Sequence, residues 1–268
     1  MFKNQVVWIT GASSGIGEAL ALQFAGDSAQ LVLSSRREDE LNRVRDLCLD
    51  AGLKPEQVLV LPLDVTHYDA MQPALERVMS AFGRIDMLIN NAGISQRARC
   101  IETDLSVYRQ LMEIDVFGQI ALTKMVLPLM VEQGSGHIAV TSSVAGKVGA
   151  PYRTGYCAAK HAIMGFFDAL RAEVTHQGIR VTTITPGFIR TNIAINALKG
   201  DGSVFGQTDR NIEGGMEVNQ AAAVIMKGFR KGKPEIAVGK GMEMHALWLK
   251  RFFPRMLMKI TAKIPPQD

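Results

Sequence analysis

Cysteine is scarce in this sequence. The 268 residues include three cysteines, Cys48, Cys100 and Cys157, and neither their odd number nor their spacing fits a disulfide framework or a metal site. The five histidines also lack the spacing of metal ligands. We therefore expect no metal, and free thiols of this kind are typical of the cytoplasmic location that we predict.

Long apolar runs and blocks of one charge are lacking too. We find no leader-like start and expect no apolar run to span a bilayer. The 30 basic and 26 acidic residues leave a net charge of +4. The basic residues are spread along the chain, with mild clusters only at 36–37, 227–233 and 250–263. A charge so small and dispersed, without a recognition motif, predicts no nucleic-acid partner.

What the sequence does contain is a regular alternation of strand-like and helix-like segments. Short apolar runs, typical of buried strands, occupy residues 6–9, 31–33, 58–61, 87–89, 137–140, 179–184 and 235–238. Helical spacing of apolar residues marks 15–25, 38–51, 68–82, 105–130 and 154–176. This order predicts an α/β fold class, with a single doubly wound, Rossmann-type parallel sheet of seven strands and helices on both faces.

No linker or internal repeat divides the chain. We interpret residues 1–268 as a single Rossmann-fold domain. Within it, the glycine-rich polar stretch 192–215 is expected to form a substrate loop or lid. Residues 242–268 form an amphipathic C-terminal extension.

A glycine-rich turn follows the first expected strand. Gly11 permits a tight turn, Gly15 lets backbone approach a pyrophosphate, and Gly17 lets the next helix pack closely on the sheet. The start of that helix offers free N–H groups and a partial positive charge to an anion. A strand before the turn and a helix after it are the context that a dinucleotide site requires.

The end of the second expected strand indicates which dinucleotide binds. NAD usually needs a carboxylate there for the ribose 2′-hydroxyl, but Ser34 and Ser35 are followed by Arg36 and Arg37. Because a guanidinium pairs with a 2′-phosphate, we predict NADP(H), with NAD(H) as the alternative. The other interpretation is that both arginines only solvate the start of a helix.

Tyr156 and Lys160 are four residues apart in an expected helix, so they lie on one face. An ammonium close to a phenol favours the phenolate and makes proton exchange near neutral pH feasible. Ser143 follows the fifth expected strand, at the edge where open α/β sheets bind ligands. It could hydrogen-bond a substrate oxygen and hold it against the tyrosine hydroxyl.

Over nearly its whole length the sequence resembles the short-chain dehydrogenase/reductase family, and within it the DHRS7-like branch. The matching pieces, in order, are Thr10-Gly11-x-x-x-Gly15-x-Gly17, Asp64-Val65, Asn91-Ala92-Gly93, Ser143, Tyr156-x-x-x-Lys160, Pro186-Gly187 and Thr191. The resemblance implies a reductase or dehydrogenase that moves hydride between nicotinamide C4 and a substrate carbon.

The resemblance also implies roles for individual residues. Tyr156 would exchange the proton, Lys160 would assist it and hold the nicotinamide ribose, and Ser143 would orient the substrate. Asp64 would meet the adenine, and Asn91 would lie along the cofactor. The full set expected to bind the cofactor is Gly11, Ser13, Ser14, Gly15, Ile16, Gly17, Arg36, Asp64, Val65, Asn91, Ala92, Gly93, Tyr156, Lys160, Pro186, Gly187, Ile189 and Thr191.

One position departs from the family pattern. The family often carries an asparagine where this chain has Asp115, in a proton relay that runs through water to the lysine. The relay chiefly uses a backbone carbonyl, so it could survive, and a carboxylate would also stabilise a charged Lys160. We include Asp115 among the catalytic candidates; the alternative is a modestly slower enzyme or a shifted pH profile.

The C-terminal extension interleaves apolar and basic residues around Pro254, which could begin a second helix. Packing in the core or against another subunit is the interpretation we favour. The alternatives are a cap on the pocket, which would suit a lipophilic substrate, and contact with a membrane surface.

Three functions are compatible with these observations. The leading one is a carbonyl reductase or alcohol dehydrogenase for a small-molecule carbonyl or alcohol. A 3-oxoacyl thioester reductase is the first alternative, with Arg97 and Arg99 as contacts for an acidic carrier protein. The second is a non-catalytic nucleotide-binding regulator. The family resemblance implies a homodimer or homotetramer.

Overall fold

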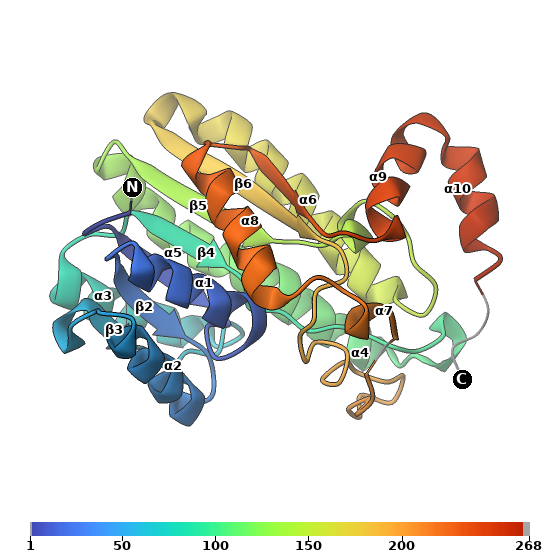
Figure 1. Ribbon diagram of the computed structural model, residues 1–268, viewed down its shortest axis with the longest axis horizontal. Coiled ribbons are helices and arrows are strands. Elements are labelled where there is room, and N and C mark those ends of the chain that lie inside the picture. The colour runs from blue at the N-terminus through green and yellow to red at the C-terminus, as the bar shows by residue number, and fades with distance from the viewer. Residues whose placement is uncertain (1, 209, 265–268) are drawn as a thin grey trace.

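The computed structural model describes residues 2–208 and 210–264, which form one sheet between two layers of helices (Figure 1). The strands of that sheet are β1 (Val6–Thr10), β2 (Gln30–Ser34), β3 (Val58–Val60), β4 (Met87–Asn90), β5 (Gly136–Thr141), β6 (Ile179–Pro186) and β7 (Glu235–Val238). Within the described residues all seven are parallel, in the order β3-β2-β1-β4-β5-β6-β7. The predicted doubly wound fold is therefore confirmed.

Seven helices cover the sheet or follow its strands. They are α1 (Gly15–Gly26), α2 (Glu38–Asp50), α3 (Met71–Phe82), α4 (Leu105–Met112), α5 (Gly118–Glu132), α6 (Thr154–Val174) and α8 (Val218–Arg230). Helices α1, α2 and α8 lie on one face, and α3, α5 and α6 on the other (Figure 1).

The central strand β1 shows why both faces need cover. Val7 and Ile9 belong to the core shared with α1 and α8, whereas Val6 and Trp8 belong to the core shared with α5 and α6. Successive side chains of a strand point to opposite faces, so a strand that is apolar throughout must be buried on both. Trp8 satisfies its indole N–H with the Ser34 hydroxyl at 2.9 Å.

The long helical region predicted from residue 105 onward contains an irregularity. Helices α4 and α5 are joined without a break by a π-helical turn, Glu113–Phe117, and such turns often mark functional positions. The whole stretch, 28 residues, is long and apolar enough to cross a membrane, contrary to our expectation. Half of its most apolar part is buried inside the protein, where Leu122 and Val126 pack in the core, and this burial accounts for its composition.

The segment after β6 contributes to the same end of the sheet as the loops after β1, β4 and β5. Residues 192–215 are mostly irregular, with the short helix α7 (Arg210–Glu213). Leu198 bridges to Gln96 and to Val204, which ties this loop to the loop after β4. Beyond β7, the C-terminal extension forms α9 (Met242–Phe252) and α10 (Pro254–Thr261), and Pro254 begins the second helix as predicted.

Candidate active site

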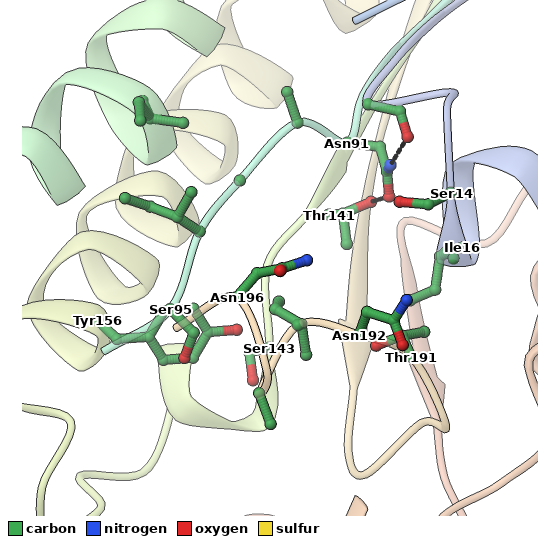
Figure 2. Close-up of a pocket in the computed structure, with 18 of the residues that line it drawn as sticks. Ser14, Ile16, Asn91, Ser95, Thr141, Ser143, Tyr156, Thr191, Asn192 and Asn196 are labelled. Carbon is green, nitrogen blue, oxygen red and sulfur yellow. Dashed lines mark hydrogen bonds between the residues drawn. The ribbon is translucent and has the colours of Figure 1, made fainter. Parts of the chain in front are cut away.

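A cavity of about 690 Å³ lies at the carboxyl ends of the central strands. It is lined by all the residues we predicted for the site except Gly17 and Asp115. In Figure 2, Ser14, Ile16, Asn91 and Thr191 lie toward one end, and Ser95, Ser143, Tyr156 and Asn196 gather at the other. We call these the nucleotide end and the substrate end of the cavity.

The glycine turn has the geometry that its sequence predicted. Gly11 and Gly15 adopt φ angles of +65° and +59°, in the left-handed region that favours glycine. A Cβ on Gly17 would meet the Gly11 carbonyl oxygen at 2.3 Å, so Gly17 lets α1 pack against the turn from behind the cavity wall. The Ser14 side chain makes no capping hydrogen bond to α1, which leaves first-turn N–H groups for an anion.

A hydrogen-bond network holds the turn to the neighbouring strands. The Asn91 amide donates to the carbonyl oxygens of Thr10 and Gly11 at 3.2 and 3.3 Å, and its oxygen accepts from the Thr141 hydroxyl at 3.1 Å. The Thr10 hydroxyl accepts from the backbone N–H groups of Asn91 and Ala92. The supporting role of Thr141 was not anticipated, because it depends on a contact 50 residues away in the chain.

Both Arg36 and Arg37 line the nucleotide end. Arg37 donates to the Ser13 hydroxyl at 3.5 Å, so it reaches the glycine turn itself, although our cofactor set named only Arg36. Burial acts to raise the pKa of Asp64, but hydrogen bonds from the Thr66 N–H and hydroxyl and the nearby charge of Arg36 lower it overall. This end of the cavity therefore combines one ionised carboxylate with two guanidinium groups.

Tyr156 and Lys160 are brought together as predicted. Both are buried, with 6% and 4% of their surface exposed, and the Lys160 ammonium lies 5.7 Å from the centroid of the Tyr156 ring. The ammonium donates to the Thr141 carbonyl oxygen at 3.2 Å. The ammonium therefore lies close to the phenol inside the cavity.

Ser143 stands beside this pair at the substrate end (Figure 2). Its hydroxyl accepts from the Ala145 N–H at 3.1 Å and donates to the Pro186 carbonyl oxygen at a long 3.4 Å. The neighbouring Ser142 is buried and donates to the Lys160 carbonyl oxygen. Of the two serines, Ser143 is therefore the one placed to offer its hydroxyl to a ligand.

Asp115 lies behind the cavity wall, in the π-helical turn, and is fully buried. One carboxylate oxygen accepts from the Ile94 N–H at 2.8 Å. The other lies 3.3 Å from the Lys160 ammonium, although it has no partner in good hydrogen-bond geometry. Burial raises the pKa of Asp115, against the opposing effects of Lys160 and the Ile94 N–H. Asp115 therefore contacts Lys160 directly and lies outside the cavity.

The substrate end depends on residues that sequence reasoning missed. The loop after β6 lines it with Asn196, Leu198 and Val204. Buried Gln96 accepts from the Gly155 N–H at 2.7 Å and donates to Thr103, so it fixes the start of α6 immediately before Tyr156. The only signal for the loop wall of this end was the glycine-rich character of residues 192–215, whose motion as a lid stays a prediction.

Known proteins share this architecture. The family model for short chain dehydrogenases matches residues 5–202. The human dehydrogenase/reductase SDR family member 7 is 40% identical over 263 residues, which cover 97% of this chain and 78% of that protein.

Solved structures agree in fold. A short-chain dehydrogenase from Streptomyces avermitilis, 29% identical, has a TM-score of 0.83 with 97% of each chain covered. A Burkholderia phymatum short-chain dehydrogenase/reductase in complex with NAD, 23% identical, also has a TM-score of 0.83, with 100% and 99% covered. The chain belongs to the short-chain dehydrogenase/reductase family of oxidoreductases and is similar to its member 7 proteins.

Proposed function

We propose that this protein is an NADP(H)-dependent oxidoreductase that interconverts a carbonyl compound and a secondary alcohol. The observation that carries the proposal is the buried pair of Tyr156 and Lys160 in the same cavity as the glycine turn. A proton-exchanging phenol and an anion-binding turn in one cavity fit a reaction that moves a hydride and a proton together.

The residues of the nucleotide end fit a dinucleotide. The positive φ angles of Gly11 and Gly15 let bare backbone face a pyrophosphate, and the uncapped first turn of α1 offers it N–H donors. We expect Asp64 to contact the adenosine part and Lys160 the nicotinamide ribose, as the family resemblance implies. When bound, a nicotinamide cofactor supplies or accepts the hydride.

The protein's own side chains donate and accept the proton. In the reducing direction, the Tyr156 hydroxyl donates its proton to the carbonyl oxygen while the Ser143 hydroxyl hydrogen-bonds the same oxygen. The Lys160 ammonium stabilises the phenolate that remains. In the oxidising direction the phenolate takes the alcohol proton. Burial of Tyr156 and Lys160 limits water around the transfer, which strengthens each of these charge interactions.

Two guanidinium groups support NADP(H) over NAD(H). Arg36 and Arg37 line the cavity where the second strand ends. Residues 34–37 contain no carboxylate that could accept hydrogen bonds from the ribose hydroxyls. A 2′-phosphate would gain charge-assisted hydrogen bonds there.

The alternatives find less support. Arg99, one of the two arginines considered for a carrier protein, is exposed and lies 3.6 Å from Glu102, an arrangement common on any surface. A non-catalytic regulator would not need the buried Tyr156 and Lys160 pair. A cytoplasmic location and a homodimer or homotetramer remain part of this proposal.

The test is consumption of NADPH with a panel of ketones by the wild-type protein and by Tyr156→Phe. We expect the variant to keep its affinity for NADPH and to lose roughly 100- to 10,000-fold in kcat, the usual contribution of a general acid. Equal activity of the two proteins would refute the mechanism.

A further inference from the structure

The C-terminal helices α9 and α10 project from the side of the molecule as a helical pair (Figure 1). One side of the pair is fixed to the body. Leu257 is buried together with Val144 and Val148, and the Glu243 carboxylate accepts from the Phe188 N–H at 3.2 Å. The pair therefore has a defined position, and its remaining surface faces outward.

That outward surface is rich in large apolar side chains. Eight of the eighteen exposed large apolar residues found in the described chain fall within 242–264, less than a tenth of its length: Met242, Trp248, Phe252, Phe253, Met256, Met258, Ile260 and Ile264. Trp248 is 68% exposed, and its ring stacks on that of Phe252 at 5.5 Å. Exposed apolar clusters of this kind mark interaction surfaces.

The same segment is strongly basic. Its exposed charges are Lys250, Arg251, Arg255, Lys259 and Lys263, and the only acidic residue from 242 to 264 is Glu243. The Glu243 carboxylate accepts from the backbone at Gly241 and Phe188, on the side fixed to the body, so a single acidic residue stands against five cations. We call the exposed apolar residues and the five cations the C-terminal patch.

We infer that the C-terminal patch docks the protein on the surface of an anionic lipid bilayer. Aromatic and methionine side chains next to lysines and arginines suit the boundary between acyl chains and anionic headgroups. Each cation near such a surface adds to the attraction. The proposal does not depend on the redox activity.

A second copy of this chain fits the patch less well. In a two-fold interface the same surface of each subunit faces its partner, so the five cations would face five identical cations, with only Glu243 of each segment to offset them. Charge complementarity therefore favours an anionic partner, and the exposed Trp248 and Phe252 favour one with an apolar interior.

The experiment is flotation of the full chain with vesicles of neutral phosphatidylcholine, and with vesicles that also contain phosphatidylserine. We expect binding to the anionic vesicles, weakening as salt is raised, and far less binding to the neutral ones. Lys259→Gln with Lys263→Gln should lower the partition coefficient roughly 30-fold, at the usual contribution per cation. Trp248→Ser with Phe252→Ser should abolish binding at any salt concentration.

A matched control removes the same charge elsewhere. Lys227 and Lys231 have the same spacing and are also exposed, but lie on and just beyond α8. Lys227→Gln with Lys231→Gln should leave binding nearly unchanged, and all variants should unfold at the wild-type temperature because the altered side chains are exposed. Absence of wild-type flotation, or an equal loss in the control, would overturn the inference. The inference would also be overturned if the wild-type protein bound no vesicles and gel filtration showed a dimer that the Trp248 and Phe252 changes dissociate.

Discussion

The two ends of the cavity are built differently. The nucleotide end consists of tight turns at the ends of β1, β2 and β4, held by hydrogen bonds among Thr10, Asn91 and Thr141. One wall of the substrate end is formed by residues 192–215, of which Asn196 and Val204 are exposed. The first is an extension of the sheet, whereas the second is a loop tied to the sheet at a few points such as Leu198.

The difference separates binding of the cofactor from choice of the substrate. A turn fixed by the sheet suits a ligand that is the same in every reaction cycle, because pre-organised donors cost little to order on binding. A loop tolerates sequence change, so it suits the part of the site that selects the carbonyl compound. Changes at the nucleotide end should therefore affect cofactor affinity, and changes at the substrate end should affect KM for the carbonyl compound.

The largest effect is expected from Gly17→Ala. Its Cβ would meet the Gly11 carbonyl oxygen at 2.3 Å, and relieving this clash must shift either α1 or the turn. We expect NADPH affinity to fall roughly 100-fold as charge-assisted hydrogen bonds are lost, and stability to fall by about 1–3 kcal/mol. Titration calorimetry and urea unfolding would measure the two.

Gly26, at the other end of the same helix, is the control. A Cβ there meets nothing within 4 Å, so Gly26→Ala should leave both cofactor affinity and stability unchanged or slightly raise stability. If both variants behaved alike, the close packing at Gly17 would not explain the geometry of the turn.

Replacing Arg36 and Arg37 together with alanine should have the next largest effect. We expect NADPH to bind roughly 10- to 50-fold more weakly, because charge-assisted hydrogen bonds to the 2′-phosphate are lost, while NADH binding stays the same. Arg45→Ala, which removes a half-exposed guanidinium paired with Asp46 on α2, should change neither. An equal loss for both cofactors would show that the arginines do not recognise the phosphate.

Asp115→Asn should change pH dependence more than maximal rate. The substitution removes a negative charge 3.3 Å from the Lys160 ammonium. The site becomes more positive, so the pH midpoint of the kcat profile should move downward. Glu113→Gln, an exposed position of the same π-helical turn, should leave the profile unchanged. Identical profiles for all three proteins would remove any special role for the acid.

The stability of the Asp115 variant offers a second readout. Because burial raises the pKa of Asp115, this carboxyl binds a proton more readily in the folded protein than in the unfolded chain. Its contribution to stability is present below about pH 4, the ordinary range for this group, and is lost as pH rises through the raised pKa. The unfolding free energy of Asp115→Asn, measured from pH 4 upward, should therefore depend less steeply on pH than that of the wild-type protein.

The smallest effect is expected at the substrate end. Asn196 lines the cavity near Tyr156 (Figure 2), so Asn196→Ala should raise KM for a polar carbonyl substrate about fivefold, the worth of one hydrogen bond, without changing NADPH affinity. Ile195 is adjacent and exposed but does not line the cavity, and Ile195→Ala should have no effect on KM. A change in NADPH affinity at Asn196 would contradict the proposed division between the ends.

The nucleotide end could be predicted because its determinants are local in the sequence. Gly11, Gly15 and Gly17 report backbone requirements directly, and the apolar runs of β1 and β4 place the turns at one edge of the sheet. The spacing of Tyr156 and Lys160 is likewise a property of a single helix. Each of these signals lies within one turn or one element.

The rest could not be predicted because it depends on long-range contacts. Gln96 supports Gly155 across 59 residues, and Thr141 supports Asn91 across 50; nothing in the local sequence indicates either. The reach of Arg37 to Ser13 depends on the backbone at the start of α2. The exposure of the C-terminal patch depends on which face of α9 and α10 meets Val144, and periodicity left three outcomes open there.

A crystal structure of the complex with NADP⁺ and an unreactive alcohol or ketone would test the central claim most directly. The account predicts the nicotinamide ring at the substrate end, with the bound oxygen about 3 Å from the hydroxyls of both Tyr156 and Ser143 and the 2′-phosphate against Arg36 and Arg37. A nicotinamide ring bound away from Tyr156, with the substrate oxygen out of its reach, would contradict it.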